Sequence, residues 1–493
     1  MVRPAIALLT ALLVTAPAYP VDLPAMGSSA GRTLSLDDEA AIGRQVMREL
    51  RAAGIILDDP AATEYLQSLG QRLASVSGDR AQQYTFFLVD SADLNAFALP
   101  GGYIGINAGL VMATADESEL AGVVAHEIAH VSQRHIARNF EQAKKFGAVT
   151  AAAMLAAIIV GVTSGSTEVA QAGIAAGQSM MIQNQINFTR LHEHEADRVG
   201  IGTLAAAGFD PYAMARMFDT MERRARLSGA FLPDFLRTHP VSAERISEAR
   251  DRAKALAGDP PRVSRAYPLM RARARALATD PAEAVRWFRS TLEGASPVER
   301  EGLRYGLALA LNATGEAAEA RAIYEELLTG GEDVVYYHLG LADALFKAGE
   351  TEASLERYKE AMRVFPGSLA VTQAYAQALL YAGHGRDALE HLVALLPKSD
   401  GNPNLYRLLA MSSGAAGELA DAHYFMSEVH VLNGDLMPAI DQLQLALSIP
   451  EINQLQRRRA EARLEQLSAY LPRGQRARLD RPIPQQPLGR GIP

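Results

Sequence analysis

The hydrophobic positions along the chain predict mostly helices, with two short strands near residue 100. Residues 35–51 and 61–75 each predict a helix, and Ser35 with the acidic residues that follow it is a typical helix start. Residues 84–89 predict a buried strand, and the period-two pattern of residues 103–107 predicts a second strand after a Pro-Gly-Gly turn. We therefore expect an α+β fold that is mainly helical.

The apolar run 120–125 predicts a helix that enters a core, and it leads directly into His126-Glu127-Ile128-Ala129-His130. Helix positions four apart share a face, so His126 and His130 can point two imidazoles at one cation. Zinc lowers the pKa of a water that it binds to roughly 7, and the Glu127 carboxylate can take its proton as the water attacks an amide carbonyl. The motif proposes peptide hydrolysis. The alternative is a pair of surface histidines.

A third ligand is needed, and two patterns compete for it. In the first pattern, a turn that contains Gly follows the second His, and the third ligand is a His six positions after it. In this chain the position six after His130 is Ile136, the turn contains no Gly, and His135 is one residue too early. In the second pattern, the third ligand is a carboxylate from another helix. Residues 191–197 offer Glu193 as this ligand and Asp197 as a residue that would orient a ligand imidazole. The rivals on the same segment are His192, His194 and Glu195.

Beyond residue 258, small residues recur with a period of 34, which is the tetratricopeptide period. Small side chains let two antiparallel helices approach closely, and a glycine makes the turn between them. The columns are Ala308, Ala342, Ala376 and Ala410; Gly315, Gly349, Gly383 and Gly417; and Ala320, Ser354, Ala388 and Ala422. We expect an all-α solenoid over residues 258–470, with degenerate units at 280–292 and 434–449. The candidates for its protein-binding concave face, or for its core, are Tyr305, Tyr336, Tyr337 and Tyr375.

The start of the chain is typical of an exported protein. Arg3 precedes an uncharged apolar run, 5–14, and then Ala16-Pro17-Ala18, which has the form of a cleavage site. That run is shorter than the about 20 residues that span a bilayer. The expected terminal segments are a signal peptide at 1–18, a polar spacer at 19–34 and a disordered tail at 471–493.

Composition narrows the class of protein. With 493 residues, 48% of them hydrophobic and 21% charged, the chain is long enough for two to three globular domains. The net charge of −8 argues against nucleic acid as the main partner, and the absence of cysteine excludes disulfides and thiol catalysis. Two small-residue apolar runs within 146–183 predict a helical hairpin that packs on the peptidase or touches a membrane surface.

Three segments resemble the M48-type zinc metallopeptidases. They are residues 95–104, Asn-Ala-Phe-Ala-Leu-Pro-Gly-Gly-Tyr-Ile; the Glu119-Leu-Ala that leads into the His-Glu-x-x-His helix; and the Glu-x-x-x-Asp of Glu193 and Asp197. A signal peptide before the peptidase and helical repeats after it are similar to a periplasmic branch of this family in Gram-negative bacteria. The resemblance implies a zincin-like peptidase domain with a small sheet over residues 35–257.

The resemblance also implies a set of site residues. One Zn²⁺ per chain would be bound by His126, His130 and Glu193, with Glu127 as the catalytic base and Asp197 behind a ligand. The strand at 103–107 would lie at the cleft edge, where a substrate backbone can pair with it. In periplasmic relatives the histidine that matches His239 can occupy the position of the attacking water, so the resemblance implies an inhibitory fourth ligand.

The function that follows is a periplasmic zinc endopeptidase that acts in outer-membrane protein assembly and quality control. The resemblance implies unfolded or stalled outer-membrane proteins as clients, the barrel-assembly machinery as a partner of the repeats, and a location in the periplasm near the outer membrane. The alternative is a non-catalytic repeat chaperone or adaptor with a structural zinc site. A membrane-embedded peptidase would need several long apolar spans.

Overall fold

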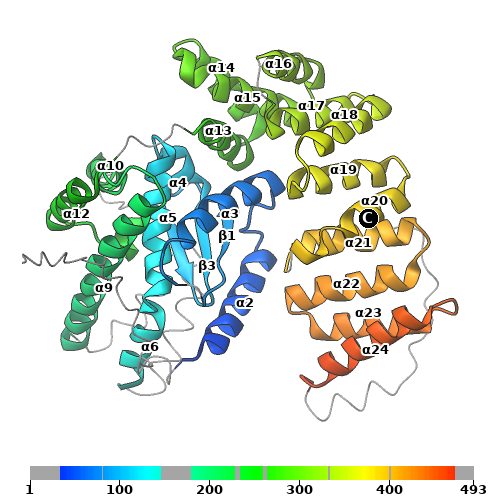
Figure 1. Cartoon of the computed structure of the whole chain (residues 1–493), viewed down its shortest axis with the longest axis horizontal. Coiled ribbons are helices and arrows are strands. Elements are labelled where there is room, and N and C mark those ends of the chain that lie inside the picture. Colours follow the sequence, from blue (N-terminus) through cyan, green and yellow to red (C-terminus); the bar gives the residue numbers. More distant parts are fainter. Residues whose placement is uncertain are drawn as a thin grey trace, which may run out of the picture.

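The computed structural model describes residues 34–79, 81–145, 179–227, 234–258, 264–330, 333–398 and 401–471 (Figure 1). The expected signal peptide and tail lie outside these residues, except for Leu471, as do nearly all of the spacer and of the hairpin at 146–183. The described part is mainly helical with one three-stranded sheet, which confirms the expected fold class. None of its helices is long and apolar enough to cross a membrane.

The sheet consists of β1 (Thr85–Val89), β2 (Ala96–Leu99) and β3 (Tyr103–Asn107) in the order β1-β3-β2. β3 pairs with β1 in parallel and with β2 antiparallel. Gly101 and Gly102 have φ angles of 79° and 82°, and this left-handed turn sends the chain back from β2 into β3. The expectation that residues 103–107 lie at the cleft edge is therefore wrong, because β3 is the central strand and β2 is an edge strand.

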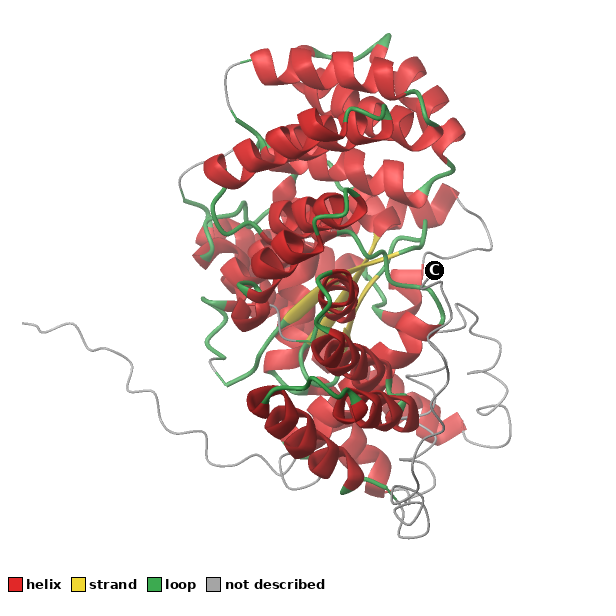
Figure 2. Ribbon diagram, turned by 90° about the vertical axis from the view of Figure 1, so that its right-hand side faces the viewer, coloured by secondary structure: helices red, strands yellow, loops and turns green. Residues whose placement is uncertain are grey.

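Helices cover both faces of the sheet (Figure 2). On one face, α2 (Leu36–Ala52) packs Val46 and Leu50 against Phe87 and Leu99. On the other face, α3 (Pro60–Ala74) and α5 (Glu117–Ser132) form a larger core with the alternate residues of the same strands. The predicted start of α2 is confirmed, since Ser35 and Asp38 form a reciprocal capping box.

The other helices of the first half lie around α5 (Figure 1). Short α4 (Ala108–Ala113) leads from β3 toward α5, and α6 (His135–Lys145) follows α5 and packs against the start of α2. The remaining members are α9 (Ser179–Ala206), α10 (Ala213–Leu227), α11 (Asp234–Thr238) and α12 (Ala243–Leu256). α5 thus lies between the sheet and α9, buried on all sides, as its apolar composition requires.

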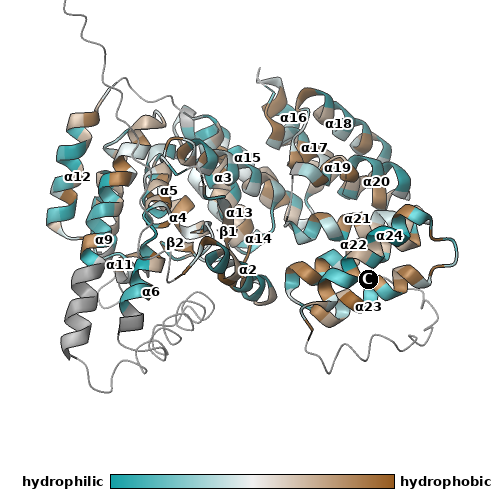
Figure 3. Cartoon of the chain, turned by 60° about the horizontal axis from the view of Figure 1, so that its bottom comes forward, coloured by the Kyte–Doolittle hydropathy of each residue, from teal (hydrophilic) through white to brown (hydrophobic). Residues whose placement is uncertain are grey.

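The second half is an array of antiparallel helix pairs that arches over α3 and α2 (Figure 1). Its helices are α13 (Ala266–Ala278), α14 (Pro281–Leu292), α15 (Pro297–Thr314), α16 (Ala317–Thr329), α17 (Val335–Lys347), α18 (Thr351–Val364), α19 (Leu369–Tyr381), α20 (Gly385–Val393), the short 3₁₀ helix η1 (Leu396–Lys398), α21 (Pro403–Ala415), α22 (Leu419–Asn433), α23 (Leu436–Ser448) and α24 (Gln454–Ser468). Figure 3 shows apolar and polar residues alternating along them, as amphipathic packing requires.

The 34-residue spacing has a direct structural cause. The four periodic glycines end the first helix of each pair with φ angles between 82° and 89°, a region that L side chains rarely adopt. Inside one pair, Ser354 Oγ donates to the Ala342 carbonyl oxygen at 2.7 Å, so two small residues of the predicted columns meet. The four tyrosines considered for the concave face belong to the core instead, because all are less than 10% exposed: Tyr305, Tyr336, Tyr337 and Tyr375.

Partly buried polar contacts join the helix array to the helices of the first half. Asp59, which caps α3, forms an ion pair with Arg273 of α13 whose Nε–Oδ1 distance is 2.7 Å. Glu64 of α3 accepts hydrogen bonds from Ser368 Oγ and from the backbone amide of Ala370 at the start of α19. Since α3 also packs against α5, one helix contacts both the repeat array and the helix of the His-Glu-x-x-His motif.

Candidate metal centre

The first two candidate ligands lie one helical turn apart on α5. The Asp116 side chain caps this helix by accepting from the Glu119 amide at 2.9 Å. His126 Nε2 and His130 Nε2 are 3.1 Å apart, so both imidazoles point at the same position. His126 is 1% exposed, and the pair therefore faces the protein interior. This confirms the shared face that the spacing predicted.

The carboxylate comes from α9, which packs closely on α5. Gly200 allows this approach, because a Cβ atom there would lie 3.1 Å from the backbone nitrogen of His126. The oxygens of Glu193 lie 3.4 Å from His126 Nε2 and 3.4 Å from His130 Nε2. The packing of α9 therefore aims Glu193 into the space between the two histidines.

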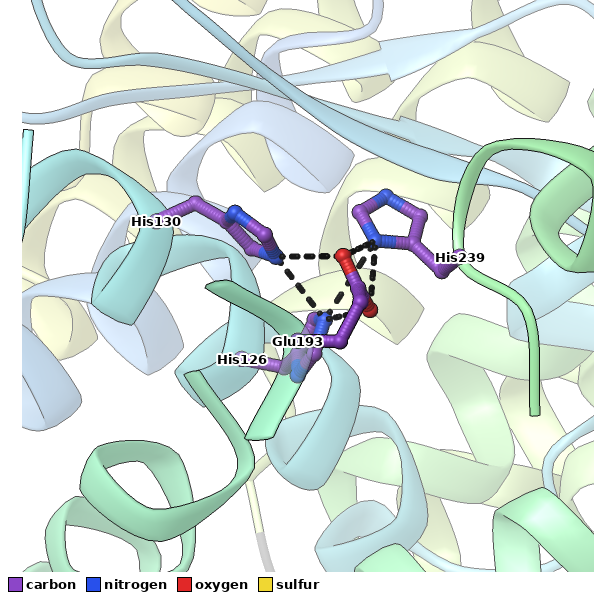
Figure 4. Close-up of side chains that lie close together, drawn as sticks. All are labelled: His126, His130, Glu193 and His239. Atoms are coloured by element: carbon purple, nitrogen blue, oxygen red, sulfur yellow. Dashed lines mark hydrogen bonds and ion pairs between the residues drawn. The ribbon is translucent and has the colours of Figure 1, made fainter. Parts of the chain in front are cut away.

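His239 follows α11 and completes the cluster from a third direction (Figure 4). Its Nδ1 lies 3.0 and 3.1 Å from the two oxygens of Glu193 and 3.4 Å from His126 Nε2. Its ring stacks on Phe235 at 4.6 Å, and Phe235 is fully buried. The other ring nitrogen, Nε2, lies 3.6 Å from Glu127 Oε1. His239 therefore contacts the ligand cluster and the candidate base at once.

The cluster fits a zinc ion. Each of the four residues offers one donor atom, and these atoms all lie within 4.8 Å of one another. Tetrahedral zinc with bonds of about 2.0–2.1 Å separates its ligand atoms by roughly 3.3–3.4 Å, which is close to the distances found here. Three imidazole nitrogens that face one another around a buried carboxylate also form a donor set that suits Zn²⁺ better than Mg²⁺.

Asp197 and Arg245 contact the candidate ligands His126 and Glu193. Asp197 Oδ1 lies 3.0 Å from His126 Nδ1, which favours the tautomer that leaves Nε2 open to a cation. Arg245 donates to Asp197 through Nε at 2.7 Å and Nη2 at 2.8 Å, and its Nη1 lies 3.0 Å from Glu193 Oε2. Arg245 is 3% exposed, so its charge offsets those of both carboxylates inside the protein.

The ionisation of these groups follows from burial and pairing. Burial opposes a charge on His126, yet its contacts with Asp197 and Glu193 raise the pKa of His126 to about 10. Burial lowers the pKa of His130 to about 4. Burial also opposes ionisation of Glu193, but His239, His126 and His130 hold the pKa of Glu193 well below its usual range. The Glu193 carboxylate is thus ready to bind a cation.

Glu127 lies beside the cluster without belonging to it. Its carboxylate is 1% exposed and lies near the backbone amide of Ala98 in β2, which helps to lower its pKa. Burial raises the pKa of Glu127, although the neighbouring His239 and His126 act in the opposite direction. A carboxylate with a raised pKa is a better proton acceptor near neutral pH.

The rival residues on α9 point elsewhere. His194 pairs with Glu248 at 3.2 Å, while Glu195 and the buried His192 both contact His135. Two residues near the cluster, Arg245 and His135, had no role predicted from sequence. Asp197, the partner of Arg245, lies 48 positions away, and Glu195, the carboxylate that contacts His135, lies 60 positions away, so local spacing could not reveal these two contacts.

Comparison with known proteins identifies the family. Residues 60–253 match the model of peptidase family M48, and residues 345–411 match a tetratricopeptide repeat model. The beta-barrel assembly-enhancing protease of Escherichia coli K12 is 31% identical over 456 residues, which cover 90% of this chain and 91% of that protein. The chain belongs to peptidase family M48. It is a metalloendopeptidase followed by tetratricopeptide repeats, which confirms the predicted enzyme class.

Two further relatives show which parts of this M48 peptidase are shared. The beta-barrel assembly-enhancing protease of Yersinia pestis is 30% identical over 446 residues, 90% of this chain and 91% of that protein. Metalloprotease LoiP of Escherichia coli K12 is 30% identical over 233 residues, which cover 46% of this chain and 86% of LoiP. The similarity to the Yersinia pestis protein therefore covers both the M48 half and the repeat half of this chain. The similarity to LoiP is about as long as the M48 half alone.

Proposed function

We propose that this M48 peptidase is a periplasmic, zinc-dependent endopeptidase whose resting state is closed by His239. The observation that carries the proposal is the convergence of four donor atoms, from His126, His130, Glu193 and His239, on one buried position. One Zn²⁺ per chain would be held there. It would polarise the scissile carbonyl and lower the pKa of the attacking water.

The residues of the chain then perform the remaining steps. Glu127 accepts the proton of the attacking water and later gives it to the leaving amine. Asp197 and Arg245 keep His126 and Glu193 in place. The substrate backbone pairs with the outer edge of β2, which no other described strand occupies. The Ala98 amide that reaches Glu127 belongs to this strand, so β2 connects the substrate edge to the base.

His239 supports the closed resting state through its two ring nitrogens. One nitrogen takes the position of a fourth ligand, and the other lies 3.6 Å from Glu127. The attacking water needs the space between the metal and Glu127, and the imidazole fills that space. The backbone amide of Phe235 also donates to the Leu94 carbonyl oxygen at 3.2 Å, so the same segment lies against the entry to β2.

The clients and the location are inferred from the sequence and the relatives. We assign residues 35–257 to the peptidase domain and residues 258–470 to the repeat domain. Two relatives that match along nearly the whole chain are named for enhancing beta-barrel assembly. Together with the predicted signal peptide, this supports unfolded or stalled outer-membrane proteins as clients, held by the repeats together with the barrel-assembly machinery.

One observation favours a second function. Because His239 completes a four-ligand set, the cluster also resembles a closed structural zinc site, as a non-catalytic chaperone or adaptor would have. The buried Glu127 beside the cluster argues against this reading, since a purely structural site needs no proton acceptor.

Metal removal tests the proposal. We expect the purified mature chain to contain one zinc by elemental analysis, and its cleavage of casein to stop when a chelator removes the zinc. Activity should return with Zn²⁺ and not with Mg²⁺, because imidazole nitrogens bind Mg²⁺ poorly. A chain that binds no zinc, or that cleaves casein equally well without it, would contradict the proposal.

A further inference from the structure

A second buried histidine, His135, supports His130. His130 Nδ1 lies 2.9 Å from His135 Nδ1, and His135 Nε2 lies 3.2 Å from Glu195 Oε2. Arg138 Nη1 donates to the same oxygen of Glu195 at 2.7 Å. His135 is 2% exposed, while Glu195 is partly exposed. A continuous row of polar contacts therefore leads from the candidate ligand His130 outward to a carboxylate at the surface.

A sharp turn between α5 and α6 places His135 against His130. Arg134 makes this turn with a φ angle of 53°, and it has the one positive φ among the described residues other than glycine. Such a conformation is unfavourable for a residue that carries a side chain. Arg134 is held by Glu39, whose Oε1 accepts from Nε at 3.1 Å, and by the Leu34 carbonyl oxygen at 2.7 Å from Nη2. These contacts offset the strain, and Ala137 and Phe140 of α6 pack against Leu34 beside them.

The direction of the hydrogen bonds follows from the donor that His130 offers. A histidine that presents Nε2 to a cation carries its proton on Nδ1. His130 Nδ1–H then donates to His135 Nδ1, which must be unprotonated, so the proton of His135 lies on Nε2 and is donated to Glu195. The ring of His135 also stacks on that of His192 at 4.1 Å and 6°, which fixes its plane. Every donor in the row meets an acceptor.

The two histidines of α5 are therefore supported by different groups. Asp197 contacts His126 directly, whereas the neutral ring of His135 stands between His130 and its carboxylate. We propose that His135 and Glu195 are positioning residues that fix the tautomer and the ring orientation of His130 for zinc binding. The inference rests on the proposed zinc site. It adds that the affinity for zinc depends on two residues that do not contact the ion.

Zinc affinity of the full mature chain tests this directly. The dissociation constant is measured by competition with a chromophoric chelator for wild type, His135→Phe and His135→Gln. Phe keeps the ring that stacks on His192 but cannot accept a hydrogen bond, so we expect about 10- to 100-fold weaker binding. Gln offers an acceptor oxygen and a donor NH2 group, so its loss of zinc affinity should stay below about tenfold. The visible spectrum of the Co²⁺-loaded protein should change in His135→Phe and be retained in His135→Gln.

Each outcome decides the question. Wild-type affinity in a folded His135→Phe variant would overturn the proposal, and so would an equal loss in the Phe and Gln variants, which would indicate a packing role alone. If His135→Phe does not fold, Glu195→Ala removes the partly exposed end of the row. Weaker zinc binding there supports the proposal, and unchanged binding contradicts it.

The control variant is His194→Ala. His194 pairs with Glu248, so this variant should bind zinc as wild type does. A wild-type chain without zinc would refute the proposed function itself, which separates the two failures.

Discussion

Cleavage of casein should rise about tenfold or more when His239 is replaced by Ala, because a closed state that is favoured by a few kcal/mol would leave only a minor fraction of open molecules. In the structure, His239 Nδ1 lies 3.4 Å from His126 Nε2, and His239 Nε2 lies 3.6 Å from Glu127 Oε1. Without the ring, both the coordination position and the space before Glu127 become available to water. The measurement is the initial rate of casein cleavage at equal zinc content.

The matched control for this variant is His194→Ala. His194 lies in α9 and contacts Glu248, so its removal takes away a histidine without touching the cluster. The control should cleave casein at the wild-type rate. If His239→Ala retains its zinc and remains as inactive as wild type, the closed-state account is wrong and the chaperone or adaptor reading gains support.

Replacing Glu127 by Gln lowers casein cleavage by roughly 10²- to 10⁴-fold in the His239→Ala background, because general-base catalysis contributes a factor of this size. Gln has nearly the same shape as Glu, but it cannot take up a proton at neutral pH. Zinc content should stay at one per chain, since Glu127 lies outside the four donor atoms. The two readouts are cleavage rate and elemental analysis.

An exposed carboxylate supplies the control for Glu127→Gln. Glu222 on α10 pairs with Arg226 in the next helical turn, and Glu222→Gln should change neither zinc content nor rate. Cleavage that survives in Glu127→Gln would remove Glu127 from the mechanism. Loss of zinc in the same variant would show that Glu127 supports metal binding instead.

Patterns with a local cause could be predicted from the sequence. The four glycines at intervals of 34 mark left-handed helix ends, and the shared face of His126 and His130 follows from the helical period. Glu193 could be proposed but not separated from its neighbours on α9, because the face of a helix that meets a metal depends on packing. Here the close approach at Gly200 decides it.

Features that depend on distant partners could not be predicted. β2 is four residues long, and its role as edge strand follows from β3 pairing on both sides, which no local period reveals. Arg245 acquires its role from a contact with α9, 48 positions away, and the row of contacts through His135 ends at Glu195 of the same helix. The tyrosines of the repeats have the same explanation, since burial by neighbouring helices decides whether such a ring belongs to the core or to a groove.

The most direct test of the central claim is zinc-edge X-ray absorption on the full mature chain, compared between wild type and His239→Ala. The account predicts three imidazole ligands and one carboxylate around zinc in the wild type. In the variant it predicts two imidazoles, the carboxylate and a further oxygen from water. Two imidazoles in both proteins would contradict the account, because His239 would then not be a ligand and could not close the site.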